Sequence, residues 1–366
     1  MEGMLKSLMQ SAYQNWVMII IGLGLMYLAV KKDFEPALLI PIGFGCIMAN
    51  LPLSGAIGEH GALTIIKKAL IDTELAPLLI FIGVGAMIDF GPLLQNPKMI
   101  LFGAAAQFGI FSTLLVATLL GYTLKEAASI GIIGAADGPT SILVANRFAK
   151  HLLAPISVAA YSYMSLVPII QPPVIKAITT KEERKIKMTY RTENVSKFVR
   201  LAFPVIVTII SGVIAPESVA LIGFLMFGNF MRETGVVERL SKSAQNELVN
   251  ITTILLGLTI GATMEGGEFL QPRTIFIIGL GLIAFILDTA GGVLFAKLLN
   301  LFLKDKINPM VGAAGISAFP MSSRVIQRLA QKEDPSNFLL MYAVGANVAG
   351  QIGSVIAGGL ILSLIK

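Results

Sequence analysis

Charged residues are scarce in this chain. Lys, Arg, Asp and Glu make up 14% of its 366 residues, whereas hydrophobic residues make up 55%. A soluble globular domain has about 25% charged residues. The composition therefore excludes an ordinary soluble protein and favours a chain that lies largely within a membrane. The 36 glycines fit this class, because small residues let helices approach each other closely in lipid.

Residues and motifs for several common chemistries are also missing. The chain has one cysteine, Cys46, and two histidines, His60 and His151. These numbers exclude a disulfide framework, a multi-cysteine metal site and a His-rich metal site. There is no Walker loop, no dinucleotide fingerprint and no G-x-S-x-G motif. Energy for any work in the membrane must therefore come from an ion gradient or from the chemistry of a partner.

Apolar runs long enough to span a bilayer, which takes about 20 residues, recur along the whole chain. They predict an all-α integral membrane protein with roughly ten to twelve membrane segments. Several runs are short or interrupted by Gly and Pro, which predicts broken helices. The expected spans are 15–30, 36–54, 75–90, 97–121, 125–147, 152–176, 199–215, 217–231, 250–264, 273–301, 308–330 and 336–364.

The longest polar stretch lies near the middle of the chain. Residues 177–198 contain a cluster of Lys and Arg side chains, which the positive-inside rule places on the cytoplasmic side of the membrane. This linker separates a first membrane unit, residues 1–176, from a second, residues 199–366. The net charge of +6 does not indicate nucleic-acid binding, because the basic residues lie between apolar runs, as in loops at a membrane surface.

The two membrane units resemble each other in sequence. Gly85 aligns with Gly261 and Asp89 with Glu265 at an offset of 176 residues. Upstream and downstream matches, at offsets of 176–180, are Pro36 with Pro216, Gly43 with Gly223, Asn50 with Asn229, Thr140 with Ser317 and Arg147 with Arg324. These matches predict two repeats. In transporters such repeats commonly have inverted topology, with binding sites where broken helices meet near the bilayer midplane.

The first predicted break, residues 134–141, carries an acidic side chain inside an apolar run. Asp137 precedes Gly138 and Pro139, which should open the helix and free backbone carbonyl groups. Such a backbone is tolerated at membrane depth only when it is buried in protein or lines a wet cavity. Carbonyl oxygens, a carboxylate and a hydroxyl suit a small cation. Asp137 is therefore a candidate ion ligand, although it could also simply cap the helix that follows.

The second predicted break, residues 308–320, has no carboxylate. It offers an amide, several glycines, a hydroxyl and a guanidinium, from Asn308, Gly312, Ser317 and Arg324. Arg324 is suited to an anion that faces the cation site, but it could equally mark the cytoplasmic end of the segment.

Two further residues in apolar runs are weaker candidates. Tyr163 could relay a proton, although most buried tyrosines only pack and find a hydrogen-bond partner. Asp288 could be a second residue on an ion pathway, because ionisable groups within membrane segments are usually functional.

Three segments together resemble the β subunit of the sodium-translocating decarboxylases, a group that includes oxaloacetate, glutaconyl-CoA and methylmalonyl-CoA decarboxylases. They are residues 134–140, 227–237 and 308–324. The resemblance covers essentially the whole chain. The family motif at the first break begins Gly-Gly-Ala-Asp, and here the second position is Ala135, which keeps a small side chain.

The resemblance implies a function and a set of partners. In the family, the β subunit decarboxylates carboxybiotin carried by a partner, consumes a proton and couples this reaction to Na⁺ export. The expected partners are a carboxyltransferase subunit, a biotin carrier subunit and a small membrane-anchor subunit, in the inner membrane. Biotin is not expected on this chain, since Lys187-Met188 stands in a charged linker. Gly-rich outer helices would also permit a homo-oligomer.

The resemblance also assigns roles to individual residues. The family's sodium ligands fall on Asp137, Asn308, Gly312 and Ser317. Its residues for handling carboxybiotin and protons fall on Asp137, Tyr163 and Arg324, with Ser317 beside the cofactor.

Two other functions fit the same pattern of broken helices. A Na⁺/H⁺ or carboxylate antiporter would share the inverted repeats. A purely structural anchor for an enzyme complex is the other, but it does not explain an acidic residue and paired breaks inside apolar runs.

Overall fold

The computed structural model describes residues 13–32, 36–52, 54–135, 137–188 and 194–365. Within these ranges the chain is built from helices and connecting segments, with no β-strand, which confirms the predicted all-α class. Ala136, within the first predicted break, and residues 189–193, within the central linker, lie outside the described residues.

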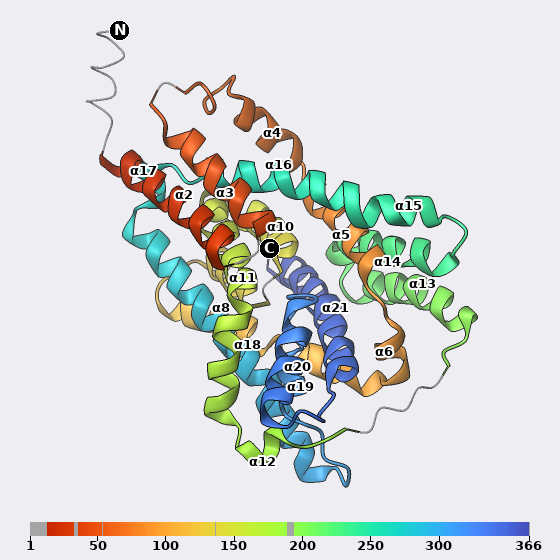
Figure 1. Cartoon of the computed structure of the whole chain (residues 1–366). Helices are drawn as coiled ribbons and strands as arrows, with labels where there is room; N and C mark the ends of the chain where they lie inside the picture. Colours follow the sequence, from red (N-terminus) through yellow and green to blue (C-terminus); the bar gives the residue numbers. More distant parts are fainter. Residues whose placement is uncertain (1–12, 33–35, 53, 136, 189–193, 366) are drawn as a thin grey trace, which may run out of the picture.

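The first part of the chain, up to the linker, forms the following elements (Figure 1): α2 (Tyr13–Lys32), α3 (Pro36–Asn50), α4 (Ala62–Leu70), α5 (Leu75–Met87), α6 (Gly91–Gln95), η1 (Pro97–Met99), α7 (Ile100–Ala105), α8 (Phe108–Leu119), α9 (Leu124–Gly131), η2 (Ile132–Ala135), α10 (Gly138–Phe148), η3 (Lys150–Leu152), α11 (Leu153–Ile178) and α12 (Lys181–Arg184).

The second part forms α13 (Lys197–Ile214), η4 (Pro216–Ser218), α14 (Val219–Thr234), α15 (Glu238–Ser243), the π-helical η5 (Ala244–Leu248), α16 (Val249–Ala262), α17 (Gly266–Phe269), α18 (Pro272–Phe302), α19 (Met310–Ala313), α20 (Met321–Glu333) and α21 (Leu340–Leu364).

Six helical stretches in the described residues are long and apolar enough to cross a membrane. They become seven if α4 and α5, which meet at a bend of 63°, form one broken span. The chain is therefore a multi-pass membrane protein. The number is below the expected ten to twelve because several apolar runs fold as short helices, such as α3 with 15 residues and α16 with 14.

Local signals explain several helix ends. Thr123 begins α9 with a capping box, in which its hydroxyl accepts from Glu126 N and the Glu126 carboxylate accepts from Thr123 N. Ser196 caps α13 by accepting from Val199 N. α14 ends at Gly235, whose φ of 70° is a conformation that glycine adopts without steric cost.

Two pairs of helices, each joining one half of the chain to the other, cross through glycines. α3 packs on α16, and α5 packs on α14 (Figure 1). A Cβ atom at Gly85 would lie 1.8 Å from the Leu225 carbonyl oxygen, and one at Gly261 would lie 2.0 Å from the Ile42 carbonyl oxygen. Only glycine therefore permits these backbones to come so close.

Matched asparagines hold the same two crossings. Asn50 Nδ2 donates to the Met264 carbonyl at 2.7 Å, and Asn229 Nδ2 donates to the Ile88 carbonyl at 2.9 Å. Asn50 aligns with Asn229, and Ile88 aligns with Met264, in the sequence comparison of the halves. These equivalent contacts support the predicted repeat; its inverted orientation remains a prediction.

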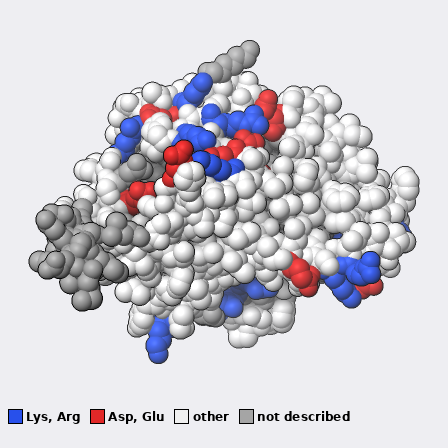
Figure 2. All heavy atoms as spheres, turned by 90° about the horizontal axis from the view of Figure 1, so that it is seen from above, with Lys and Arg blue, Asp and Glu red and all other residues white. Residues whose placement is uncertain are grey.

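The predicted breaks lie where α10, α11, α18 and α21 come together, in the central part of Figure 1. Most charged side chains lie on the outside of the molecule; the buried ones in the described part of the chain are Glu126, Asp137, Arg184 and Asp288. On the face shown in Figure 2 the charged side chains gather in a few places where acidic and basic residues are intermixed, with broad uncharged areas between them. Broad uncharged areas of this kind suit contact with lipid.

Candidate functional site

Asp137 stands at the break between η2 and α10. It is the N-cap of α10 and only 3% exposed. One carboxylate oxygen accepts from Thr140 N at 3.2 Å, and the other accepts from the Thr140 hydroxyl at 2.7 Å. Pro139 is tolerated because the first turn of a helix has no intrahelical partner for its N–H groups. The sequence thus folds into a half-helix that starts on a buried carboxylate.

A helix from the far end of the chain completes the surroundings of this carboxylate. From α21, Ser354 Oγ donates to Asp137 Oδ2 at 2.7 Å and Gln351 Nε2 donates to the same oxygen at 3.1 Å. Hydrogen bonds of this kind stabilise a buried charge. The hydroxyl oxygens of Thr140 and Ser354 therefore lie beside Asp137, and oxygen atoms so grouped are the ligands that a hard cation takes.

The second break touches the first through Ser317. Its backbone N donates to the Ala135 carbonyl at 3.0 Å, and its hydroxyl donates to the same carbonyl at 2.7 Å. Ala135 is the last residue of η2, so this carbonyl belongs to the opened helix. The structure therefore brings Ser317 and Asp137 into one region, as the sequence predicts.

Gln171 of α11 supports the second break from the other side. The residue is fully buried, and its Nε2 donates to the Ala313 carbonyl at 2.8 Å. Ser322 donates to Gln171 Oε1 at 3.0 Å and also to the Ala313 carbonyl at 3.2 Å. A carbonyl at the end of α19 thus receives its donors from side chains.

Gly312 lies at a close approach between α19 and α18. A Cβ atom there would be 2.0 Å from the Gly292 carbonyl oxygen, and a Cβ atom at Gly292 would be 2.1 Å from the Gly312 carbonyl oxygen. Both positions therefore need glycine for packing.

Among the described residues, neither Asn308 nor Arg324 donates a hydrogen bond to the Asp137 carboxylate. Asn308 Nδ2 donates to the carbonyls of Arg184 and Ile186 in the central linker, at 2.9 and 2.8 Å, and its Oδ1 accepts from Met310 N. Arg324 is exposed in the first turn of α20. The geometry joins Asn308 to the linker and leaves Arg324 at the surface.

The two tyrosines of α11 differ in their surroundings. Tyr163 donates to the Ile278 carbonyl, and its ring stacks on Phe285 with centroids 6.5 Å apart. Tyr161 packs on the Asp137 turn instead, since a Cβ atom at Gly138 would lie 2.3 Å from its ring. Within the described part of the chain its hydroxyl has no hydrogen-bond partner.

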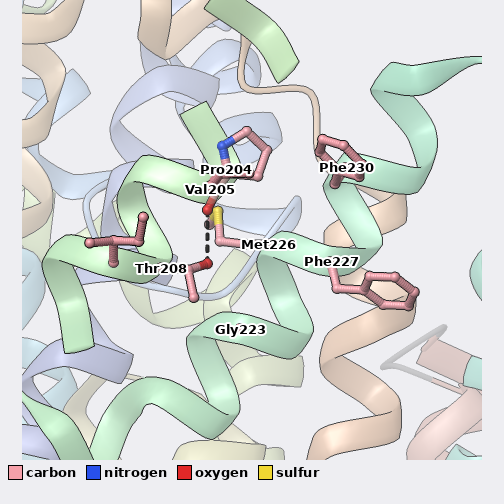
Figure 3. A pocket seen from close by; sticks show the side chains of 8 residues that line it. Pro204, Val205, Thr208, Gly223, Met226, Phe227 and Phe230 are labelled. Atoms are coloured by element: carbon pink, nitrogen blue, oxygen red, sulfur yellow. Dashed lines mark hydrogen bonds between the residues drawn. The ribbon is translucent and has the colours of Figure 1, made fainter. Parts of the chain in front are cut away.

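The cavity drawn in Figure 3 is a separate feature. It lies between α13 and α14 and is lined mainly by apolar side chains, including Met226, Phe227 and Phe230. The Thr208 hydroxyl donates to the Pro204 carbonyl within α13 at 2.8 Å. The described residues that line it include no charged side chain and none of the residues around Asp137, so it is separate from the site at Asp137.

The chain matches the family described as "Na+-transporting oxaloacetate decarboxylase beta subunit" over residues 14–365. It belongs to that family.

This chain is similar to β subunits that are named after different decarboxylases. It is 54% identical to the glutaconyl-CoA decarboxylase subunit beta of Acidaminococcus fermentans, with 96% of this chain and 93% of that protein covered. It is 53% identical to the methylmalonyl-CoA decarboxylase subunit beta of Veillonella parvula, at the same coverage. It is 45% identical to the oxaloacetate decarboxylase beta chain 2 of Salmonella typhi, with 100% and 98% covered. The chain is thus a membrane-embedded β subunit of a Na⁺-transporting decarboxylase.

Proposed function

We propose that this β subunit binds Na⁺ at the Asp137 break and couples its export to the decarboxylation of carboxybiotin. The observation that carries the proposal is the buried Asp137 carboxylate with the hydroxyls of Thr140 and Ser354 bonded to it. A buried carboxylate surrounded by oxygen atoms in a membrane protein is suited to a small cation that enters and leaves.

The residues of the second break would act around that ion. Ser317 adds a hydroxyl next to the freed Ala135 carbonyl, and both oxygens can serve as ligands. Asn308 and Gly312 belong to the same proposed sodium set. Their contacts favour indirect action, because Asn308 fixes the linker and Gly312 sets the spacing of α19 from α18.

The remaining proposed roles concern carboxybiotin. Arg324 is exposed and cationic, so its guanidinium can hold the substrate carboxylate, with Ser317 deeper in the same break. When the N–CO₂⁻ bond breaks, CO₂ leaves and the ring nitrogen takes up a proton. Tyr163 is the proposed relay for that proton, and Asp137 would release one when Na⁺ binds. Decarboxylation would then proceed only in the sodium-loaded state, which is the condition for coupling.

The proposed assembly follows from the same function. Carboxybiotin needs a biotin carrier subunit, a carboxyltransferase subunit that loads it, and a small membrane subunit that holds them together. We place the β subunit in the inner membrane, with the linker 177–198 on the cytoplasmic side.

The test uses the reconstituted complex and the variant Asp137→Asn, which keeps the shape of the side chain and removes its charge. Sodium-dependent CO₂ release and ²²Na⁺ uptake into vesicles should both fall about 100-fold or more, the scale of losing a catalytic ionisable group. Asp137→Glu should lose activity as well. Asp89→Asn, at an exposed carboxylate, is the matched control.

Normal sodium activation of CO₂ release in Asp137→Asn would contradict this proposal. Flux through the isolated β subunit without a biotinylated partner would favour the antiporter instead.

A further inference from the structure

A second acidic residue, Asp288, lies fully buried in the middle of α18. Its Oδ1 accepts from the backbone N of Gly109 at 2.5 Å and of Ile110 at 3.2 Å. These N–H groups belong to the first turn of α8, just after the interruption between α7 and α8. One oxygen of Asp288 is therefore used to start a helix.

The other oxygen faces the Asp137 break. Asp288 Oδ2 has no hydrogen-bond partner among the described residues. A Cβ atom at Gly134 would lie 2.6 Å from this oxygen and 2.9 Å from the Ala284 methyl group. The carboxylate thus stands between the start of α8 and η2, the segment that leads into Asp137.

The elements that pack on α18 carry charged residues near their ends or not at all. η2, α7, α8 and α19 contain no charged residue. α9 brings Lys125 and Glu126, and Glu126 pairs with Arg273 at the start of α18. α18 itself ends near Lys297. α11 brings Lys176 at its far end and two tyrosines, of which Tyr163 is bonded to the Ile278 carbonyl. Asp137 lies three residues beyond Gly134.

Capping alone does not explain an acid at this position. Asparagine offers the same acceptor oxygen to the two N–H groups without burying a charge. The other oxygen, Oδ2, is buried without a hydrogen-bond partner among the described residues, and a proton carried on it is what asparagine cannot supply. Two N–H donors fix Asp288 Oδ1, whereas Oδ2 borders Gly134 of η2. A movement of η2 would therefore change the surroundings of Oδ2.

We propose that Asp288 is a second ionisable site of the subunit, which holds a proton on Oδ2 and releases it when the Asp137 break moves. The proposal rests on the proposed function, because the proton that Asp288 releases would go to the ring nitrogen of biotin after CO₂ has left. The O–H bond of Asp288 breaks, and the carboxylate stays bonded to Gly109 and Ile110. A proton suits Oδ2, since this oxygen belongs to a fully buried residue and has no hydrogen-bond partner among the described residues.

The test is Asp288→Asn, which keeps the cap on α8 and removes the exchangeable proton. Infrared titration of the purified subunit should show the C=O band of a protonated carboxylic acid, and the variant should lose one such group. In the complete complex, decarboxylation should fall about 100-fold and lose its pH dependence. Asp89→Asn is the control and should leave the band and the pH profile unchanged.

A second variant changes the surroundings of Asp288 Oδ2 and leaves Asp288 itself in place. Gly134→Ala keeps Asp288 but pushes a methyl group against Oδ2, so the midpoint of the infrared titration should shift from that of the wild type. This measurement applies even where Asp288→Asn does not assemble.

An Asp288→Asn complex with the wild-type pH profile and an undiminished band would overturn the proposal, as would an unshifted midpoint in Gly134→Ala. A wild-type complex without sodium dependence would overturn the proposed function instead, while the infrared result on the isolated subunit would still decide the role of Asp288.

Discussion

At the scale of single residues, the Asp137 carboxylate depends on donors from two places in the chain. Thr140 comes from its own half-helix, whereas Ser354 and Gln351 come from α21, more than 200 residues away. The proposed ion site therefore requires α21 to be packed against the Asp137 break.

Ser354→Ala should weaken sodium activation without preventing folding. A hydrogen bond to a charged group contributes about 1.5–3 kcal/mol, so the sodium concentration for half-maximal decarboxylation should rise by a factor between about 10 and 150. Sodium titration of CO₂ release measures this. Ser363→Ala is the matched control, since Ser363 bonds only to the Gly359 carbonyl further along α21. An unchanged half-activation in Ser354→Ala would remove Ser354 from the site.

The sequence predicts Asp137 but not its partners, for a physical reason. A Gly-Pro pair beside an acid is a local signal, because it disrupts the hydrogen bonding of the helix that contains it. Ser354 and Gln351 stand in a continuous apolar helix, where polar residues usually join helices to one another. Which residues they meet depends on long-range packing. The same limit applies to Asn308, because nothing in the sequence of residues 308–320 indicates that its side chain contacts the linker.

At the scale of helices, the crossings of α3 with α16 and of α5 with α14 bring the backbones of the two halves close together at glycines. Expected spans such as 75–90 and 336–364 overlap the observed α5 and α21 closely. α4 was absent from the expected spans because it is short and carries Lys67 and Lys68.

Gly85→Ala and Gly261→Ala should destabilise the protein by similar amounts, because both place a methyl group on a backbone carbonyl at equivalent crossings. Overpacking costs about 1–3 kcal/mol, and a rigid backbone places these variants at the upper end. Thermal unfolding in detergent measures the loss. Gly279→Ala in α18, with nothing within 4 Å of its Cβ position, should be neutral or stabilising. A large difference between the first two variants would contradict the equivalence of the crossings.

At the scale of the whole molecule, the central linker is fastened to the second half. Arg184 is buried against Glu333 at 2.8 Å, and Lys187 lies 3.1 Å from Asp334. Hydrogen bonds from Ser336 lower the pKa of Asp334 to about 2. Because its pKa is lowered, Asp334 keeps its charge at neutral and mildly acidic pH. The ion pair of Asp334 with Lys187 is lost only as the pH falls from about 4 towards 2.

Asn308→Ala should release this linker. The variant loses two hydrogen bonds, to the Arg184 and Ile186 carbonyls, each contributing about 0.5–1.5 kcal/mol, so trypsin should cut after Lys185 or Lys187 about tenfold faster. Mass spectrometry of a timed digest locates the cuts. Asn300→Ala, which frees Ile307 but does not touch the linker, is the control. Equal cutting rates in the two variants would show that Asn308 does not fasten the linker.

The two helix pairs that join the halves, α3 with α16 and α5 with α14, also affect how the chain inserts into the membrane during synthesis. When the ribosome has released the first half, α3 and α5 are in the membrane with their glycine surfaces uncovered, because their partners α16 and α14 are not yet synthesised. The first half must wait in that state until most of the second half has been inserted. A chain that stops at the linker leaves α3 and α5 without the helices on which they pack, and we expect it to be degraded faster than the full-length chain.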